Sequence, residues 1–231
     1  RGHMDGSFTM SNPYPADCEK MFTNLASYLR GAGMSEALRA LYYARKKHRG
    51  QKRKDGAPYI VHPLRMACYA AALGIRSDSV MCTILLHDIC EDLGIPVKEL
   101  PFDEKVRTGV QYVTITKFDT DRSKDETKRR YYSELIYSPE ACITKGIDKY
   151  DNLTDMVFTL SNDAIGKNAA ETDLLLLPVL KEAKEEYSEF SDILYIIRTN
   201  LKSIAGIYMM VFNDQYEKWK AIFSASFVEN N

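Results

Sequence analysis

Hydrophobic positions recur at helical spacing along nearly the whole chain. Apolar side chains fall three or four residues apart over 15–33, 35–50, 62–75 and 77–95, and glycine, serine or proline stands at the breaks. This spacing places apolar side chains on one face of an α-helix, and serine caps and glycine stops mark helix ends. The pattern predicts four helices in the first part of the chain.

The second part of the chain continues with the same period. Further helices are predicted at 103–113, 124–137, 139–153, 168–190 and 191–225. The polar stretch 114–124 predicts a loop, and the turn-rich stretch 160–173 predicts another, mobile loop. No alternating strand series or internal repeat interrupts the pattern, so the predicted fold class is an all-α helical bundle.

The composition narrows the function only slightly. Of 231 residues, 45% are hydrophobic and 27% charged, with a formal net charge of −1. This balance creates no global field for nucleic acid, so no nucleic-acid partner is expected. No apolar run reaches the roughly 18 residues that a membrane-spanning helix needs, so no membrane partner is expected. The five scattered cysteines form no CxxC pair and favour a reducing compartment, hence the cytoplasm.

The predicted helix containing LLHDICEDLGI (85–95) carries polar residues that its apolar surroundings do not explain. His87 and Asp88 follow the apolar run CTILL, which predicts burial, and a buried carboxylate without a partner is unfavourable. Adjacent helical residues point about 100° apart, so these two share an ion only where the site wraps the helix. Imidazole and carboxylate ligands suit manganese, iron or zinc. The predicted ligands are His62, His87, Asp88 and Asp148.

Two further carboxylates and a basic cluster lie close to these ligands in sequence. Glu91 and Asp92 come one helical turn after the His-Asp pair and face the same region. The stretch ARKKHRGQKRK (44–54) contains seven Lys or Arg and no acid, and it ends eight residues before His62. Because the stretch lies so close to His62 in sequence, a phosphate-binding role is favoured over the alternative that it is only a solvent-exposed helix end.

Three segments resemble the HD-type metal phosphohydrolases of the RelA/SpoT type, which hydrolyse the alarmone ppGpp. HDICED resembles the signature HDxxED, RKDGAPYIVHP resembles RKxGxPYxxHP, and KGIDKYDNL resembles KxxDRxxNL/M. VQYVTITK resembles the VxxVT stretch between them, and all occur in the expected order. The resemblance implies an all-α HD-domain helical bundle with a motif core at about 35–155 and additional C-terminal helices at about 156–231.

The resemblance also implies a role for each matching residue. Four residues would bind one Mn²⁺ ion, with another divalent transition metal as the alternative: His62, His87, Asp88 and Asp148. Two carboxylates would orient and activate the attacking water: Glu91 and Asp92. Three residues would bind the nucleotide: Arg53, Lys54 and Asn152. The implied reaction removes pyrophosphate from the 3′ position of ppGpp or pppGpp and gives GDP or GTP.

Asp151 departs from the family pattern, which usually has an aromatic residue or His before the Asn. An acid at this place is expected to repel phosphate, so an adenine alarmone, NADPH or a dNTP stays open as the substrate. A non-catalytic nucleotide sensor or antitoxin is the other alternative. Glu91 and Asp92 argue against it, because a pure binder needs no water-activating pair.

The domain organisation follows from the same comparison. RGHMDGSFTM (1–10) resembles an expression-tag remnant, so a single HD domain is expected over 11–231. The length leaves no room for the synthetase domain of bifunctional relatives and favours a stand-alone small alarmone hydrolase. The apolar C-terminal helices are expected to pack on the core, and they leave a homo-oligomer open.

Overall fold

The computed structural model describes residues 15–53, 55–115 and 124–225. Within these ranges the chain is all-α and contains no strand, as the sequence predicted; one isolated bridge joins Lys52 and Pro58. None of the described helices combines the length and apolar character needed to cross a membrane. The proposed tag remnant at 1–10 lies outside the described residues.

The helices follow the predicted order with a few changes. The first half contains α1 (Cys18–Gly31), α2 (Ser35–Lys47), α3 (Val61–Ala72), α4 (Asp78–Leu86), α5 (Ile89–Leu93) and α6 (Glu104–Val113). The second half contains α7 (Lys124–Glu134), α8 (Pro139–Asp155), α9 (Asn162–Glu171), α10 (Leu177–Glu186), α11 (Ser191–Val211) and α12 (Asn213–Ala225). A π-helical turn, Thr172–Leu176, joins α9 to α10.

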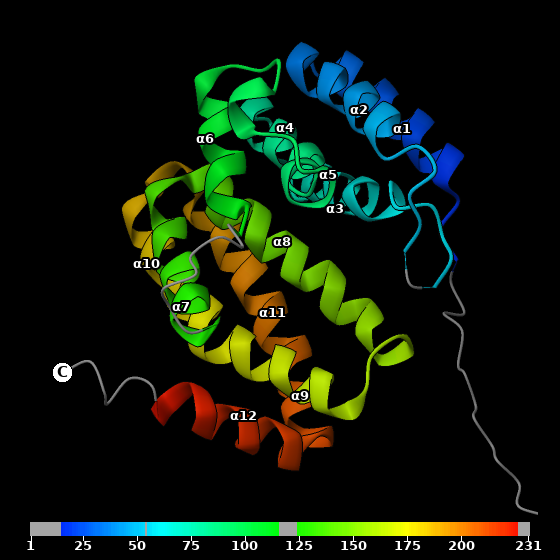
Figure 1. The fold of residues 1–231 in the computed structure, drawn as a ribbon. Coiled ribbons are helices and arrows are strands. Elements are labelled where there is room, and N and C mark those ends of the chain that lie inside the picture. The colour runs from blue at the N-terminus through cyan, green and yellow to red at the C-terminus, as the bar shows by residue number, and fades with distance from the viewer. Residues whose placement is uncertain (1–14, 54, 116–123, 226–231) are drawn as a thin grey trace, which may run out of the picture.

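Helix α8 runs through the middle of the bundle (Figure 1). It packs against α3, α4 and α6 on one side and against α10 and α11 on the other. Ser138 caps its N-terminus by accepting a hydrogen bond from the Ala141 N–H, and Pro139 occupies its first turn. Helices α1 and α2 cover α3 and α4, and α12 closes the opposite end against α9. Side chains on one face of α8 therefore point toward α3 and α4 inside the core.

The predicted loop at 160–173 is wrong, because most of it forms helix α9. Ser161 caps this helix, and Ile165 and Ala169 are buried on its inner face. Gly166, within this stretch, lies where α12 passes close to α9. Tertiary packing here outweighs a poor local helix propensity. The predicted helix 191–225 also divides, between α11 and α12.

Replacing Gly166 with alanine is expected to destabilise the fold by about 1–3 kcal/mol through overpacking. A Cβ at this position would lie 2.4 Å from the Gln215 Cβ and 2.9 Å from the Tyr216 backbone nitrogen. Gly206→Ala is the matched control, because a Cβ there meets no atom within 4 Å among the described residues. It should stabilise α11 by up to about 1 kcal/mol. Urea unfolding measures both, and equal effects would contradict the packing argument.

Candidate active site

The predicted helix at 77–95 is interrupted at the two residues expected to bind a metal. Helix α4 ends before His87 and α5 begins after Asp88, so both lie in a turn. The His87 Nδ1–H donates to the Ile84 carbonyl at 2.8 Å. A side chain that takes a backbone carbonyl competes with the helical hydrogen bonds. The turn lets both side chains face one point, which a continuous helix does not allow.

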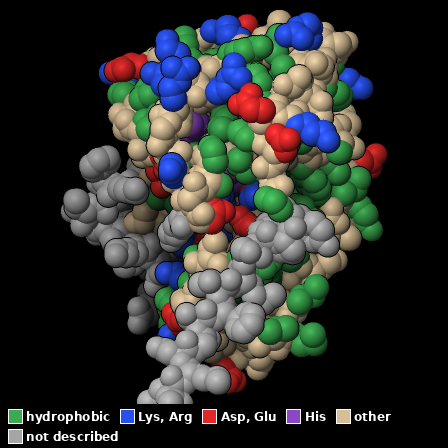
Figure 2. All heavy atoms as spheres, turned by 90° about the vertical axis from the view of Figure 1, so that its right-hand side faces the viewer, with side chains coloured by type: hydrophobic (Ala, Val, Ile, Leu, Met, Phe, Trp, Pro, Cys, Tyr) green, Lys and Arg blue, Asp and Glu red, His purple; other side chains and the backbone are tan. Residues whose placement is uncertain are grey.

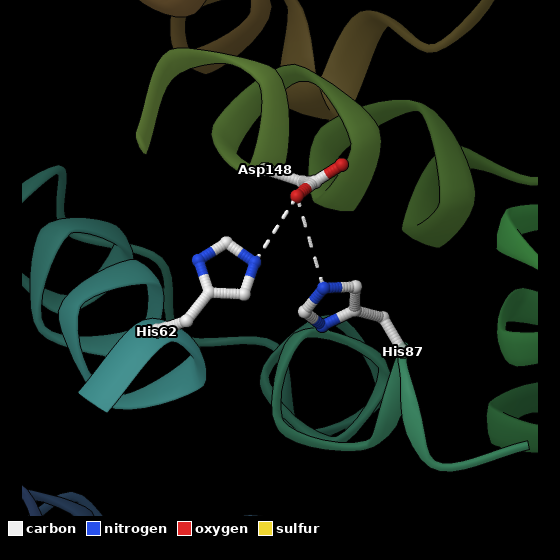
Figure 3. Close-up of side chains that lie close together, drawn as sticks. All are labelled: His62, His87 and Asp148. Atoms are coloured by element: carbon white, nitrogen blue, oxygen red, sulfur yellow. Dashed lines mark hydrogen bonds and ion pairs between the residues drawn. The ribbon is translucent and has the colours of Figure 1, made fainter. Parts of the chain in front are cut away.

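Four side chains from α3, this turn and α8 converge, and Figure 3 shows three of them. The His62 Nε2 lies 3.1 Å from the Asp148 Oδ1 and 3.8 Å from the Asp88 Oδ2. The His87 Nε2 lies 3.0 Å from the Asp88 Oδ2 and 3.8 Å from the Asp148 Oδ1. His62, His87 and Asp148 are buried, and their ligand atoms lie within 4.8 Å of one another. All four predicted ligands are thus brought together; we name this group the HHDD cluster.

The donor set of the HHDD cluster fits a divalent metal ion. The His87 Nε2 is buried and has no hydrogen-bond partner within the described part of the chain. Because its Nδ1 carries the proton donated to Ile84, the Nε2 lone pair points into the cluster. Metal-binding histidines usually fix their second ring nitrogen in this way. Two imidazoles and two carboxylates are a suitable ligand set for a divalent transition metal.

The carboxylates in and beside the cluster stabilise a positive charge on the histidines or on a bound ion. Burial lowers the pKa of His62, but its hydrogen bonds to Asp148 and Asp151 raise it more, to about 9. Burial raises the pKa of Asp148, but Lys145 at 2.7 Å and the two histidines hold that pKa well below its ordinary range. A metal ion must displace the His62 proton, so metal binding releases protons and weakens as the pH falls.

Tyr59 and Lys145 support the cluster, and the sequence analysis assigned neither a role. The Tyr59 hydroxyl donates to the Asp88 carboxylate, and the Lys145 Nζ donates to the Asp148 Oδ2. Both residues lie inside the motifs quoted above, in PYIVHP and KGIDKYDNL. Their position in those motifs was the available signal, but spacing alone shows no contact. Each partner orients one carboxylate of the cluster.

Replacing Tyr59 with phenylalanine is expected to weaken divalent-metal binding by about 10- to 100-fold, the range for losing a partner of a metal ligand. The Asp88 carboxylate then loses its hydroxyl donor while the packing volume stays nearly the same. Calorimetric titration with Mn²⁺ or Zn²⁺ measures the effect. Tyr69→Phe is the control: Tyr69 lies on α3, the helix that follows Tyr59, and its hydroxyl accepts a hydrogen bond from Asn200 instead. Equal affinities in both variants would contradict this assignment.

One cavity contains the cluster and a second cavity adjoins it. The first, of about 250 Å³, is lined by the HHDD cluster together with Glu91, Tyr131 and Lys145. The second, of about 280 Å³, is lined in part by Met156, Leu160 and Asn168. Arg53, Tyr59 and Asn152 line both. Figure 2 shows Lys and Arg side chains gathered over the end of the molecule that contains α1 and α2, with a histidine visible in a recess.

The structure brings two of the three predicted nucleotide-binding residues to these cavities. The Arg53 side chain is 16% exposed, and its Nη2 lies 3.3 Å from the Asp155 Oδ2. The Asn152 Nδ2 donates to the Asp148 Oδ1 at 2.7 Å, so this amide stands beside the cluster. Lys54 lies outside the described residues. Arg53 and Asn152 therefore stand where the two cavities adjoin.

The structure separates the two predicted catalytic carboxylates. Glu91 lines the first cavity and accepts a hydrogen bond from the Ile115 N–H at 3.3 Å. Asp92 is exposed and accepts one from the Gln51 Nε2 at 2.8 Å; neither cavity has it among its lining residues. Continuous helix geometry placed both beside the cluster, and the turn before α5 changes that geometry. Glu91 is the carboxylate beside the cluster.

The expectation that Asp151 repels phosphate is wrong, because this side chain points away from both cavities. It is buried, and its two oxygens accept hydrogen bonds at 2.8 Å from the Arg65 Nε and Nη2. Its Oδ2 also lies 2.7 Å from the His62 Nδ1. The negative charge is therefore neutralised behind the cluster, and it does not face a ligand in the cavities.

Comparisons with known proteins agree with this geometry. An HD-domain family model matches residues 40–129. A guanosine-3′,5′-bis(diphosphate) 3′-pyrophosphohydrolase of Aquifex aeolicus is 31% identical over 71% of this chain and 23% of its own length. Human guanosine-3′,5′-bis(diphosphate) 3′-pyrophosphohydrolase MESH1 is 37% identical over 54% of this chain and 72% of its own length.

Several curated relatives are much longer than the matched region. The bifunctional (p)ppGpp synthase/hydrolase RelA of Mycobacterium tuberculosis is 30% identical over 64% of this chain, which spans 20% of that protein. The chain thus spans about a quarter or less of the length of the Aquifex and mycobacterial relatives. A solved structure of a metazoan SpoT orthologue that hydrolyses ppGpp covers 90% of this chain and 96% of its own, at 20% identity and a TM-score of 0.45.

Proposed function

Since the chain belongs to the family of HD-domain guanosine-3′,5′-bis(diphosphate) 3′-pyrophosphohydrolases that includes human MESH1, we propose that it removes the 3′-pyrophosphate from ppGpp or pppGpp. One observation carries the proposal. The HHDD cluster lies in a cavity that adjoins a second cavity through Arg53 and Asn152. A phosphate group at the cluster and a nucleoside in the second cavity fit this arrangement.

We infer Mn²⁺ as the ion, with another divalent transition metal as the alternative. The donors are two nitrogens and two carboxylates with no thiolate, a set in which harder ions such as Mn²⁺ are well accommodated. His62, His87, Asp88 and Asp148 would hold it. When bound, such an ion lowers the pKa of a water molecule and polarises a phosphoryl oxygen.

The residues of the chain would supply positioning, charge and proton transfer. Glu91 is proposed to orient the attacking water and to accept its proton, as a general base must lie beside the reacting group. Asp92, which follows Glu91 on α5 but lines neither cavity, is proposed to assist it. Lys145 lines the cavity and places a cation near the phosphates, where phosphoryl transfer needs charge stabilisation.

The second cavity is proposed to bind the nucleoside. The Arg53 guanidinium would stack on the base, and Asn152 would contact the ribose or a phosphate. Asp155 also lines this cavity. Its Oδ2 lies 3.3 Å from the Arg53 Nη2, so it would hold this guanidinium in place against the base. The guanine alarmone is proposed over the adenine one because the chain's relatives are guanosine-3′,5′-bis(diphosphate) 3′-pyrophosphohydrolases.

We also propose a single HD domain over 11–231, with a motif core at about 35–155 and the helices of 156–231 packed upon it. The contacts of α8 with α10 and α11 support one shared core. A cytoplasmic location is proposed as well. The buried Cys82, Cys90 and Cys142 are free thiols, which suits a reducing compartment.

Incubation with Mn²⁺ is expected to convert ppGpp to GDP and pyrophosphate, identified by ion-exchange chromatography. ppApp, NADPH and dNTPs are tested in parallel, because turnover of one of them in place of ppGpp would redirect the substrate assignment. The Asp88→Ala variant should lose turnover and bound metal together, since Asp88 is a member of the HHDD cluster. Absence of turnover with every substrate would overturn the enzymatic proposal.

A further inference from the structure

Arg65 and Asp151 form a buried ion pair directly behind His62. The Arg65 Nε donates to the Asp151 Oδ1 and its Nη2 to the Asp151 Oδ2, both at 2.8 Å. Such two-point contacts between a guanidinium and a carboxylate are strong and fix the geometry of both groups. Arg65 lies three residues after His62 on α3, and Asp151 lies three residues after Asp148 on α8. The pair therefore joins α3 to α8 at the level of the HHDD cluster.

The same carboxylate contacts His62. The Asp151 Oδ2 lies 2.7 Å from the His62 Nδ1 and accepts a hydrogen bond from this N–H group. Because this bond fixes the ring, the His62 Nε2 faces the Asp148 Oδ1 at 3.1 Å. Arg65 holds Asp151 from the other side, so the carboxylate cannot turn away from His62. The ion pair between Arg65 and Asp151 alone would hold the two helices together. The additional hydrogen bond from His62 to Asp151 is not needed for that purpose.

The contacts continue to the nucleotide cavity. The Asp155 Oδ2 lies 3.3 Å from the Arg65 Nη2 and 3.3 Å from the Arg53 Nη2. Asp155 is 5% exposed and Asp151 is 8% exposed, so solvent screens these charges only weakly. An unbroken series of contacts thus runs from His62 in the cluster, through Asp151, Arg65 and Asp155, to Arg53 in the second cavity.

We propose that Arg65, Asp151 and Asp155 are positioning residues that set His62 and Arg53 relative to each other, so that the metal site and the nucleotide cavity are held by one network. The proposal rests on the proposed function and specifies how the site is built. Asp151 and Arg65 would orient His62, and Asp155 would orient Arg53. Arg65 contacts both carboxylates and would therefore influence both sites.

The test measures metal and nucleotide binding separately in three variants. Asp151→Leu should weaken Mn²⁺ binding, titrated calorimetrically without nucleotide, by about 10- to 100-fold. Asp155→Asn should weaken GDP binding and raise KM while Mn²⁺ binding stays unchanged. Arg65→Met should weaken both, because it contacts both carboxylates. This division among the three variants is the expected signature of the network.

Conservative variants and a control separate positioning from folding. Asp151→Asn keeps an oxygen for the His62 Nδ1–H and should recover most of the Mn²⁺ affinity that Asp151→Leu loses. Glu140→Gln is the control: Glu140 is a buried carboxylate near the other end of α8, bonded to Ser79 and Ser138. It should lower the free energy of unfolding and leave Mn²⁺ binding intact.

Two results would overturn the proposal. If Asp151→Leu and Arg65→Met fold and bind Mn²⁺ as the unmodified protein does, the pair only fastens α3 to α8. If either variant does not fold, Asp151→Asn and Arg65→Lys are measured in their place. Unchanged binding of both Mn²⁺ and GDP in Arg65→Lys would then refute the network. These binding measurements need no turnover. If the protein does not hydrolyse ppGpp but its Mn²⁺ affinity still depends on Asp151, the proposed substrate is rejected. The proposal that Asp151 positions His62 then still stands.

Discussion

Replacing Asp148 with asparagine is expected to remove the bound metal ion and to lower turnover by at least about 10³-fold. Metal catalysis supplies several kcal/mol of transition-state stabilisation, and each 1.4 kcal/mol is a factor of about ten in rate. The Asp148 Oδ1 lies 3.1 Å from the His62 Nε2 and accepts a hydrogen bond from Asn152. An amide at this place keeps the shape and loses the charge that an ion needs.

The same variant is also expected to unfold more easily. The Lys145 Nζ lies 2.7 Å from the Asp148 Oδ2, and the lysine side chain is only 17% exposed. Its pKa lies far above its ordinary value: burial lowers that pKa, but the Asp148 charge raises it more. Removing one partner of a buried ion pair costs about 3–5 kcal/mol, because the other charge stays in the interior. Urea unfolding measures this loss, and metal analysis by mass spectrometry measures the first effect.

Glu171→Gln distinguishes a damaged site from a damaged fold. Glu171 is buried and pairs with Lys149 at 3.1 Å and with Lys128, so its loss should destabilise the protein in the same way as Asp148→Asn. It lies outside the HHDD cluster and should leave the metal content unchanged. An Asp148→Asn protein that keeps its metal ion would show that the cluster is assigned wrongly.

The sequence pointed to the HHDD cluster because two of its members stand out from their surroundings. His87 and Asp88 follow an apolar run, and a buried charge in such a place needs a partner, whatever the detailed backbone. The turn at these two residues could not be predicted, since it depends on the His87 ring taking the Ile84 carbonyl. The spacing of apolar residues predicts a continuous helix, but a hydrogen bond from one side chain to the backbone can interrupt that helix.

The misjudged residues share one physical cause, which is contact between segments distant in sequence. Asp151 suggested repulsion of phosphate, because nothing in its own motif shows that Arg65 neutralises it from α3. The stretch 160–173 suggested a loop, because no local signal shows that α12 packs against it at Gly166. Local propensity is a weak guide where tertiary contacts decide. The polar residues of a site are therefore easier to find than the direction in which each one points.

Glu91→Gln is expected to lower kcat by about 10²- to 10⁴-fold, the range for losing a general base, with the metal ion retained. Glu91 lines the first cavity beside the HHDD cluster, and the glutamine keeps an oxygen that can accept from the Ile115 N–H. The amide cannot take a proton from water. Metal binding should persist because Glu91 is outside the ligand set.

Asp92→Asn is the matched comparison, since it removes the neighbouring carboxylate in the same helix α5. Asp92 is exposed and bonded to Gln51, so its loss should reduce kcat much less than the loss of Glu91. Steady-state kinetics with Mn²⁺ and ppGpp, together with metal analysis of both variants, measures the difference. Equal losses in kcat would mean that the two carboxylates act as a unit in the presence of substrate, with Asp92 turning from Gln51 into the cavity. A larger loss from Asp92→Asn would transfer the proton-accepting role to that residue and contradict the assignment of Glu91.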